Sequence, residues 1–315
     1  MPDSQLITKL RPPKKSVDPF RPYGWLHEQE PGPDGRLVDV NTLFLTNKEC
    51  SFKCVMCDLW KDTLDEPTPD GAIPEQVRFG LDQLPDAEMI KLYNNGNFFD
   101  KKAIPPGGHE KIARLLDGYS TVLVENHPKL CNQSVTDFQK QICGQLEVAM
   151  GLESIHPDVL PRLNKQITKT DFRKASEFLI SNGIQTRAFI LLNPPFLTDP
   201  RKNIEWCLKA VEFAFDCGIG TCSIIPTRPG NGIMDQLLED EDFVPPTLGA
   251  LEEVFDRALQ IGQGRVFADT WDLEKFSDCP YCIEARKNRL HNMNLQQMVL
   301  QPVKCSCKRS PLEGR

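Results

Sequence analysis

Three closely spaced cysteines constrain this chain more than any other stretch. Cys50, Cys54 and Cys57 form a C-x3-C-x2-C array that directly follows the apolar run 38–45, which has the pattern of a buried strand. Thiolate sulfur is a soft ligand that selects iron–sulfur clusters or zinc. Three thiolates suit three irons of a [4Fe–4S] cube and leave the fourth iron open to a small molecule. A closed structural zinc site would need a fourth ligand nearby, and the next cysteine is Cys131.

The array and its position after a strand resemble the signature of the radical SAM superfamily, which binds S-adenosylmethionine (SAM) at the open iron. The resemblance implies that Cys50, Cys54 and Cys57 are the catalytic cluster ligands. It also implies that the residue before the third cysteine lies by the adenine; this residue is usually aromatic, but here it is Met56, a flexible and polarizable side chain. The alternatives are a zinc loop or three unrelated cysteines buried in the core.

Strand-like and helical patterns alternate along the middle of the chain. Apolar runs at 38–45, 89–93, 121–125, 146–152, 186–192 and 221–225 predict strands, and helices are expected near 75–84, 110–116, 135–142, 157–163, 171–182, 203–215 and 248–261. This alternation predicts an α/β fold with a parallel sheet covered by helices. Periodicity does not separate a barrel from an open doubly wound sheet, but the resemblance implies a partial (β/α)6 TIM-like barrel.

The two ends of the chain differ from its middle. Residues 1–36 are rich in proline, which rules out a long helix and predicts an irregular N-terminal extension. Residues 37–264 are assigned to the radical SAM partial barrel. Residues 265–315 are assigned to a small C-terminal cysteine-rich module.

Polar residues follow several predicted strands, where chemistry gathers in (β/α) barrels. They are Asn95, Gly96 and Asn97 after the second strand, Glu125 at the end of the third, Glu153 at the end of the fourth, and Lys165 soon after. Glycine in the first group allows a ligand to approach the backbone closely. Arg228, after the sixth strand, could hold a phosphate or carboxylate, or could cap a helix.

The resemblance over residues 37–260 is strongest to enzymes related to Elongator subunit 3 and archaeosine synthase. It implies that the Gly96 loop holds the amino group of SAM, and that Glu125 bonds its ribose hydroxyls or ammonium. It further implies that Glu153 contacts the ribose region and that Lys165 pairs with the SAM carboxylate. Many superfamily members end the glycine loop in Glu, where this chain has Asn97. The alternatives are an ordinary turn and surface ion pairs.

A second cysteine group lies near the C-terminus. Cys279 and Cys282 form a C-x2-C pair, and Cys305 and Cys307 form a C-x-C pair. Four thiolates can close a tetrahedral zinc site or hold a second iron–sulfur cluster, and the company of the first array favours a second [4Fe–4S] cluster. Such an auxiliary cluster could pass electrons, bind substrate, or donate sulfide for sulfur insertion.

Composition narrows the partners and the compartment. The chain has twelve cysteines and no secretory signal, which predicts metal ligation in a reducing cytoplasm. No apolar run approaches the ~20 residues of a membrane span. The formal net charge of −7 is a poor match to a polyanion such as RNA.

These observations predict a radical SAM enzyme that abstracts hydrogen from a small, nucleoside-like substrate. Its partners would be SAM, that substrate and an external electron donor. One alternative is a tRNA-modifying enzyme of the archaeosine-synthase type. The other is a non-catalytic zinc-binding interaction module, with zinc at both cysteine groups.

Overall fold

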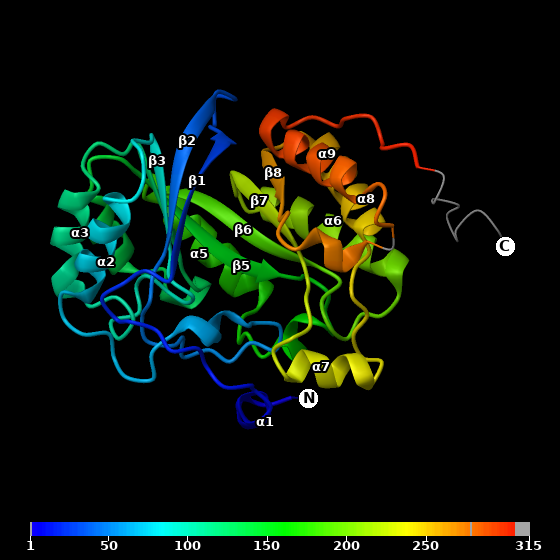
Figure 1. Ribbon diagram of the computed structural model, residues 1–315, viewed down its shortest axis with the longest axis horizontal. Helices are drawn as coiled ribbons and strands as arrows, with labels where there is room; N and C mark the ends of the chain where they lie inside the picture. The colour runs from blue at the N-terminus through cyan, green and yellow to red at the C-terminus, as the bar shows by residue number, and fades with distance from the viewer. Residues whose placement is uncertain (1, 278, 306–315) are drawn as a thin grey trace.

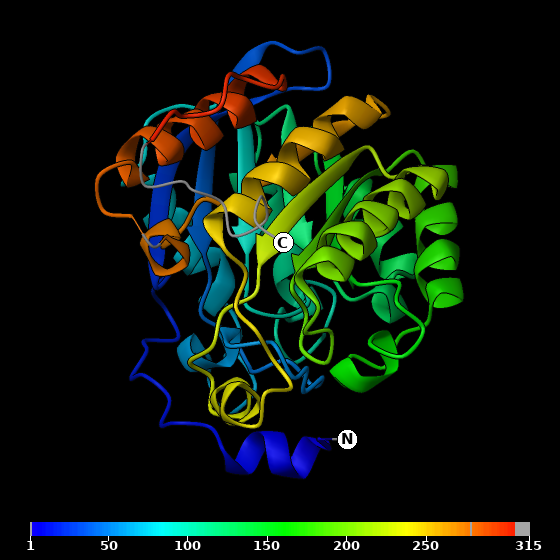
Figure 2. The same ribbon diagram turned by 90° about the vertical axis from the view of Figure 1, so that its right-hand side faces the viewer.

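The computed structural model describes residues 2–277 and 279–305, and within them eight strands form one sheet in sequence order. The strands are β1 (Gly24–Pro31), β2 (Leu37–Phe44), β3 (Met89–Tyr93), β4 (Thr121–Glu125), β5 (Gln145–Glu153), β6 (Gln185–Leu192), β7 (Thr221–Pro226) and β8 (Arg265–Ala268). β1 pairs antiparallel with β2, and every later pair is parallel. The sheet curls into a partial barrel (Figures 1 and 2), so the predicted fold class is confirmed.

The described helices are α1 (Ser4–Lys9), α2 (Ala72–Leu81), α3 (His109–Leu115), α4 (Gln133–Gln139), α5 (Lys169–Ser181), α6 (Pro200–Asp216), α7 (Ile233–Glu239), α8 (Leu248–Ile261) and α9 (Ile283–Gln296). Most of them cover the outer face of the sheet, whereas α1 and α7 pack beside the cysteine loop, where Ile7, Ile233 and Val55 belong to one apolar cluster (Figure 1). Alternate residues of each strand face the helices: Leu43 and Leu45 from the β2 region pack with Ile73 and Val77 of α2. The main core therefore lies between the sheet and the helices, and the inner face of the sheet has a separate, smaller apolar cluster that includes Val40, Met89 and Leu123.

The structure contains elements that the sequence did not predict. β1 lies inside the segment expected to be irregular, and β8 extends the parallel sheet beyond the sixth predicted strand. The helix α7 was also missed, and the helix expected near 157–163 is only the short 3-10 turn η4 (Leu160–Leu163). β1 escaped prediction because its Glu28 and Glu30 look like solvent-facing residues.

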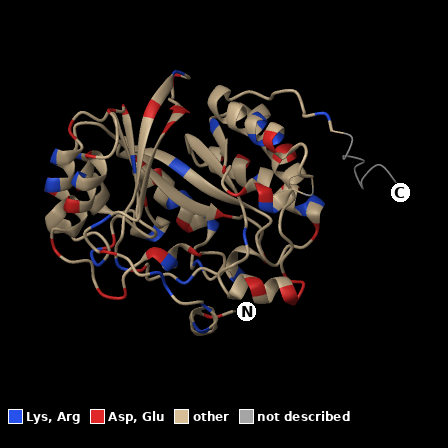
Figure 3. Cartoon of the chain, in the orientation of Figure 1, with Lys and Arg blue, Asp and Glu red and all other residues tan. Residues whose placement is uncertain are grey.

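Those two carboxylates belong to a charged network on the inner face of the sheet. Lys91 donates to Glu28 at 2.9 Å and also pairs with Glu30. Arg187 bonds Glu30 at 3.1 Å and Glu147 at 2.9 Å. Figure 3 shows that basic and acidic residues lie on the strands of the sheet as well as on the helices and loops. Lys91 and Arg187 are almost fully buried, and buried charges are tolerated only when paired in this way.

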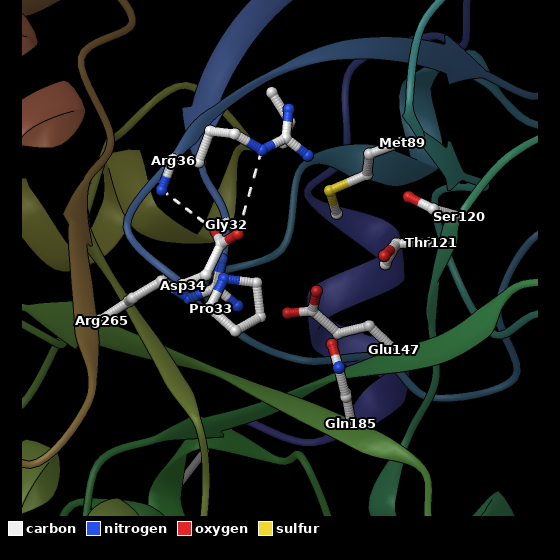
Figure 4. Close-up of a pocket in the computed structure, with 11 residues that line it drawn as sticks. Gly32, Pro33, Asp34, Arg36, Met89, Ser120, Thr121, Glu147, Gln185 and Arg265 are labelled. Atoms are coloured by element: carbon white, nitrogen blue, oxygen red, sulfur yellow. Dashed lines mark hydrogen bonds and ion pairs between the residues drawn. The ribbon is translucent and has the colours of Figure 1, made fainter.

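A pocket at the amino-terminal ends of the strands lies at the opposite end of the barrel from the cysteine loop. Its lining includes the turn between β1 and β2 and the first residues of β3, β4, β5, β6 and β8 (Figure 4). It contains no residue that the sequence predicted for the SAM site. Among the described helices, none is long and apolar enough to cross a membrane.

Candidate active site

The cysteine loop leaves the carboxyl end of β2 and ends in the 3-10 turn η1 (Leu59–Asp62). Loops from elsewhere in the barrel fix its main chain. The Val55 N–H donates to the Leu163 carbonyl at 2.9 Å, and Asn231 Nδ2 donates to the carbonyls of Val55 and Cys57 at 2.8 and 3.0 Å. Asn164 Nδ2 donates to the Lys53 carbonyl at 2.7 Å. The loop is therefore built by the tertiary fold and not by local sequence alone.

Of the three cysteines of this loop, Cys54 is buried, and Cys50 and Cys57 are half-buried. Burial raises the pKa of Cys54 to about 11 and also raises the pKa of Cys50 and Cys57. The positive charge of Lys165 opposes this rise at Cys50 and Cys54, and Asn97 Nδ2 donates a hydrogen bond to the Cys50 sulfur at 3.1 Å. Bound metal deprotonates its thiol ligands, so this donor set fits a metal cluster.

The Gly96 loop, after β3, packs directly against the cysteine loop. A Cβ added at Gly96 would lie 3.4 Å from the Cβ of Cys50. Asn95 has a left-handed φ of 51°, and its Oδ1 accepts a hydrogen bond from the Tyr23 hydroxyl at 2.7 Å. Asn94 is fully buried, and its side-chain oxygen and nitrogen both lack a partner among the described residues. Orphaned buried groups of this kind are expected where a ligand completes a site.

Glu125 faces the same loop from the end of β4. Burial raises the pKa of its carboxyl to about 8, while the backbone N–H groups of Gly96 and Asn94 donate to it and lower that pKa. The charge of Lys165 acts in the same direction. A carboxyl with a pKa near neutrality at a strand end is typical of a functional site.

Glu153 and Lys165, which the sequence assigned to separate SAM contacts, form a buried ion pair of 2.7 Å. Glu153 has a φ of 63° and lies where the pairing of β5 with β6 shifts register. A Cβ at Gly151 would fall 2.1 Å from Glu153 Oε1 and 2.5 Å from Lys165 Nζ. A side chain at position 151 would therefore have to displace the ends of Glu153 and Lys165 from their present positions.

Left-handed backbone conformations gather at this end of the barrel. The residues are Asn95, Glu153, Asn164, Gln166, Asn193 and Phe196. Non-glycine residues adopt positive φ only when surrounding structure enforces it, and such strain clusters at ligand sites.

Two further predicted positions have other contacts in the structure. Met56 is partly buried and packs against two small apolar clusters, one containing Ile7 and Val55 and the other Val159 and Leu163. Arg228 pairs with Asp269 at 2.9 Å. It neither caps a helix nor presents an unpaired guanidinium, because its remaining bonds go to the carbonyls of Pro226 and Trp271.

Sequence reasoning missed His127 as a residue of this site. Its ring stacks on Phe52 of the cysteine loop, with centroids 3.7 Å apart. The Lys129 N–H donates to its Nδ1, so the proton lies on Nε2, which donates to the Lys165 carbonyl at 2.9 Å. One imidazole therefore joins the cysteine loop to the Lys165 loop. Its place two residues after Glu125, at a strand end, was the available signal.

The second cysteine group comes together around the start of α9. The sulfurs of Cys279, Cys282 and Cys305 all lie within 4.8 Å of one another and could bind a metal. Cys279 and Cys282 are buried. The fourth predicted ligand, Cys307, lies outside the described residues.

No protein-family model matches the chain. Archaeosine synthase subunit beta of Thermococcus kodakarensis is 26% identical over 211 residues, which cover 64% of this chain and 64% of that protein. The same subunit of Methanosarcina acetivorans is 26% identical over 223 residues, which cover 65% of this chain and 61% of that protein. An uncharacterized protein of Methanocaldococcus jannaschii is 21% identical over 291 residues, or 85% of this chain and 79% of that protein.

Solved structures share the fold at low sequence identity. SuiB of Streptococcus suis bound to S-adenosylmethionine has a TM-score of 0.54 and 12% identity, covering 74% of this chain and 51% of SuiB. Elp3 of Methanocaldococcus infernus has a TM-score of 0.50 and 16% identity, covering 70% of this chain and 59% of Elp3. The chain therefore has the fold of radical SAM enzymes, and in sequence it resembles the beta subunit of archaeosine synthase.

Proposed function

We propose that this protein is a radical SAM enzyme whose cluster is held by Cys50, Cys54 and Cys57. The observation that carries the proposal is the meeting of the three-cysteine loop with the Gly96 loop, Glu125 and the Glu153–Lys165 pair at one end of the barrel. A [4Fe–4S] cluster bound there would supply the electron that cleaves SAM to methionine and the 5′-deoxyadenosyl radical, which abstracts hydrogen from substrate.

The surrounding residues would bind and orient SAM. Lys165 is buried, and although burial lowers the pKa of its ammonium group, the negative charges of Glu153 and the nearby cysteines raise it. Lys165 would exchange part of its contact with Glu153 for a contact with the SAM carboxylate. Asn94 and Asn95 would supply amide groups to the SAM amino acid moiety. Glu125 and the freed carboxylate of Glu153 would accept from the ribose hydroxyls or the ammonium. Met56 would contact the adenine.

Aromatic side chains near the mouth of the barrel support a planar, nucleoside-like substrate. The ring centroid of Phe44 lies 6.0 Å from that of Tyr93 and 6.3 Å from that of Trp271. The ring centroids of Tyr93 and Phe189 are 6.5 Å apart. Trp271 is open to solvent, with 62% of the residue exposed. Aromatic rings of this kind stack on bases.

A tRNA substrate is the second candidate, favoured by the likeness to archaeosine synthase beta subunits. The chain's net charge of −7 favours a free nucleoside instead, because RNA binding relies on phosphate neutralisation. Steeply salt-dependent binding of tRNA would support the second candidate. Absence of binding at low salt would remove it.

The proposal is tested by anaerobic reconstitution with iron and sulfide, followed by SAM and dithionite as a substitute for the external electron donor. We expect 5′-deoxyadenosine from the wild type and none from a Cys50→Ala/Cys54→Ala/Cys57→Ala variant. An iron-loaded wild type that forms no 5′-deoxyadenosine would contradict the proposal. Colourless protein with zinc as its metal at both cysteine groups would favour the interaction module.

A further inference from the structure

We infer that the C-terminal cysteines hold a single tetrahedral zinc ion and not a second iron–sulfur cube. The inference reverses the preference that the sequence suggested, and it rests on the separation of the sulfur atoms. Cys279 Sγ and Cys305 Sγ are 3.9 Å apart, and Cys282 Sγ lies within 4.8 Å of both.

A zinc–sulfur bond is about 2.3 Å long, so two thiolates on one tetrahedral zinc lie about 3.8 Å apart. In a [4Fe–4S] cube each cysteine sulfur lies outside its own iron at a corner, and sulfurs on different corners are roughly 6 Å apart. The observed separations fit one shared ion. They are too short for three corners of a cube.

The first cysteine array provides an internal comparison. Within the described part of the chain, the C-terminal triad is the one group of three potential ligands whose atoms lie within 4.8 Å of one another. The sulfurs of Cys50, Cys54 and Cys57 do not meet that criterion, although they are close enough to influence one another's pKa. The wider separation of the sulfurs in the first array suits a cube, and the closer separation in the C-terminal triad suits a single ion.

The ligand set is also that of a structural zinc site. Such sites are four-coordinate and closed by protein ligands, with C-x2-C pairs as a recurrent spacing. The described triad supplies three thiolates, and the fourth ligand that the sequence predicted, Cys307, lies outside the described residues. Each ligating thiol releases its proton to solvent when zinc binds, and no electron is transferred.

The surrounding contacts indicate what the ion would stabilise. Cys279 and Cys282 precede α9, and Cys305 lies 26 residues beyond Cys279, so the ion closes a loop around that helix. Arg289 of α9 donates hydrogen bonds to Asp256 and to the Leu300 carbonyl, both at 2.7 Å. The second bond holds the segment after α9 against the helix. Just before Cys279, Phe276 lies under Arg228, whose other contacts reach Trp271. Zinc would hold α9 and the segments on either side of it in place next to the mouth of the barrel.

The test is metal analysis of the full-length Cys50→Ala/Cys54→Ala/Cys57→Ala variant, expressed with both iron and zinc in the medium. We expect one zinc per chain, no acid-labile sulfide, and a sulfur-only shell at about 2.3 Å in the zinc X-ray absorption spectrum. Adding a Cys279→Ala/Cys282→Ala change should remove the zinc, while Cys143→Ala, at an exposed cysteine, should not.

Iron with acid-labile sulfide in that variant would overturn the inference, and so would one sulfide-free iron in place of zinc. If the variant does not fold, the same spectrum is recorded on wild-type protein, where zinc with a sulfur-only shell is again expected. Wild-type protein containing iron and sulfide beyond one cube, without zinc, would overturn the inference. Neither result depends on SAM cleavage, so this inference and the proposed function can fail separately.

Discussion

The two cysteine groups of this protein differ in how the fold prepares them. The first is a loop whose backbone is fixed by hydrogen bonds to other loops of the barrel, and its cysteines lie near Gly96, Glu153 and Lys165. The second gathers three sulfurs within 4.8 Å of one another at the start of α9. Cysteine count alone therefore does not define a metal site. From the spacing and the neighbouring residues we propose a reactive centre at the first group and a structural ion at the second.

The largest expected effect comes from breaking the first group. Cys54→Ala should abolish 5′-deoxyadenosine formation, because the cluster would lose one of its three protein ligands. Iron content and product are measured together on reconstituted protein. Cys217→Ala, at a buried core cysteine, is the matched control and should retain both. Normal product from the Cys54 variant would show that this loop is not the reactive centre.

Next in size is the loss of the cation beside the first group. Lys165→Met should weaken SAM binding by about tenfold to a hundredfold, since a charge-assisted contact to the SAM carboxylate would be removed. Iron content should be unchanged. Equilibrium binding of SAM to the reconstituted protein gives the affinity, with the exposed Lys169→Met as control. Equal affinity in the two variants would remove Lys165 from the SAM site.

A smaller, pH-dependent effect is expected at Glu125. Its carboxyl, with a pKa of about 8, is neutral at pH 7 and becomes an anion as the pH rises toward 9. SAM carries a positive sulfonium at every pH in this range. Wild-type affinity should therefore rise relative to Glu125→Gln by up to about tenfold between pH 7 and pH 9. Comparing the two proteins cancels titration of SAM itself. A constant ratio of their affinities would contradict this role.

The smallest effect on SAM chemistry should come from breaking the second group. Cys282→Ala should leave the rate of 5′-deoxyadenosine formation within about threefold of wild type, because a structural ion takes no part in cleavage. The variant should instead show faster hydrogen exchange over α9 and the segment after it, since local stability there depends on the metal. Loss of SAM cleavage with unaltered exchange would reverse the roles assigned to the two groups.

Much of the fold could be predicted from the sequence, because most of its parallel strands are short apolar runs separated by helical patterns. All six predicted strands are present, within one or two residues of their expected ends. β1 was missed because its Glu28 and Glu30 are stabilised by Lys91, more than 60 residues away. No local pattern encodes such a long-range ion pair.

The candidate site was predictable in its members but not in its internal contacts. Strand ends pointed to Gly96, Glu125, Glu153 and Lys165, and the structure brings them together with the cysteine loop. The ion pair of Glu153 with Lys165 lies at a register shift in β5 and beside Gly151, neither of which a local sequence pattern indicates. The stacking of His127 on Phe52 likewise joins two loops through the tertiary fold.

We propose that three sulfurs leave one iron of the first cluster open to SAM. This arrangement can be tested by electron–nuclear double resonance on the reduced cluster, with SAM labelled at the amino nitrogen and the carboxylate oxygen. A variant lacking Cys279, Cys282 and Cys305 confines the signal to the first group. We expect hyperfine coupling of both labelled atoms to the cluster. A reduced cluster that shows no coupling to either atom, under saturating SAM, would contradict it.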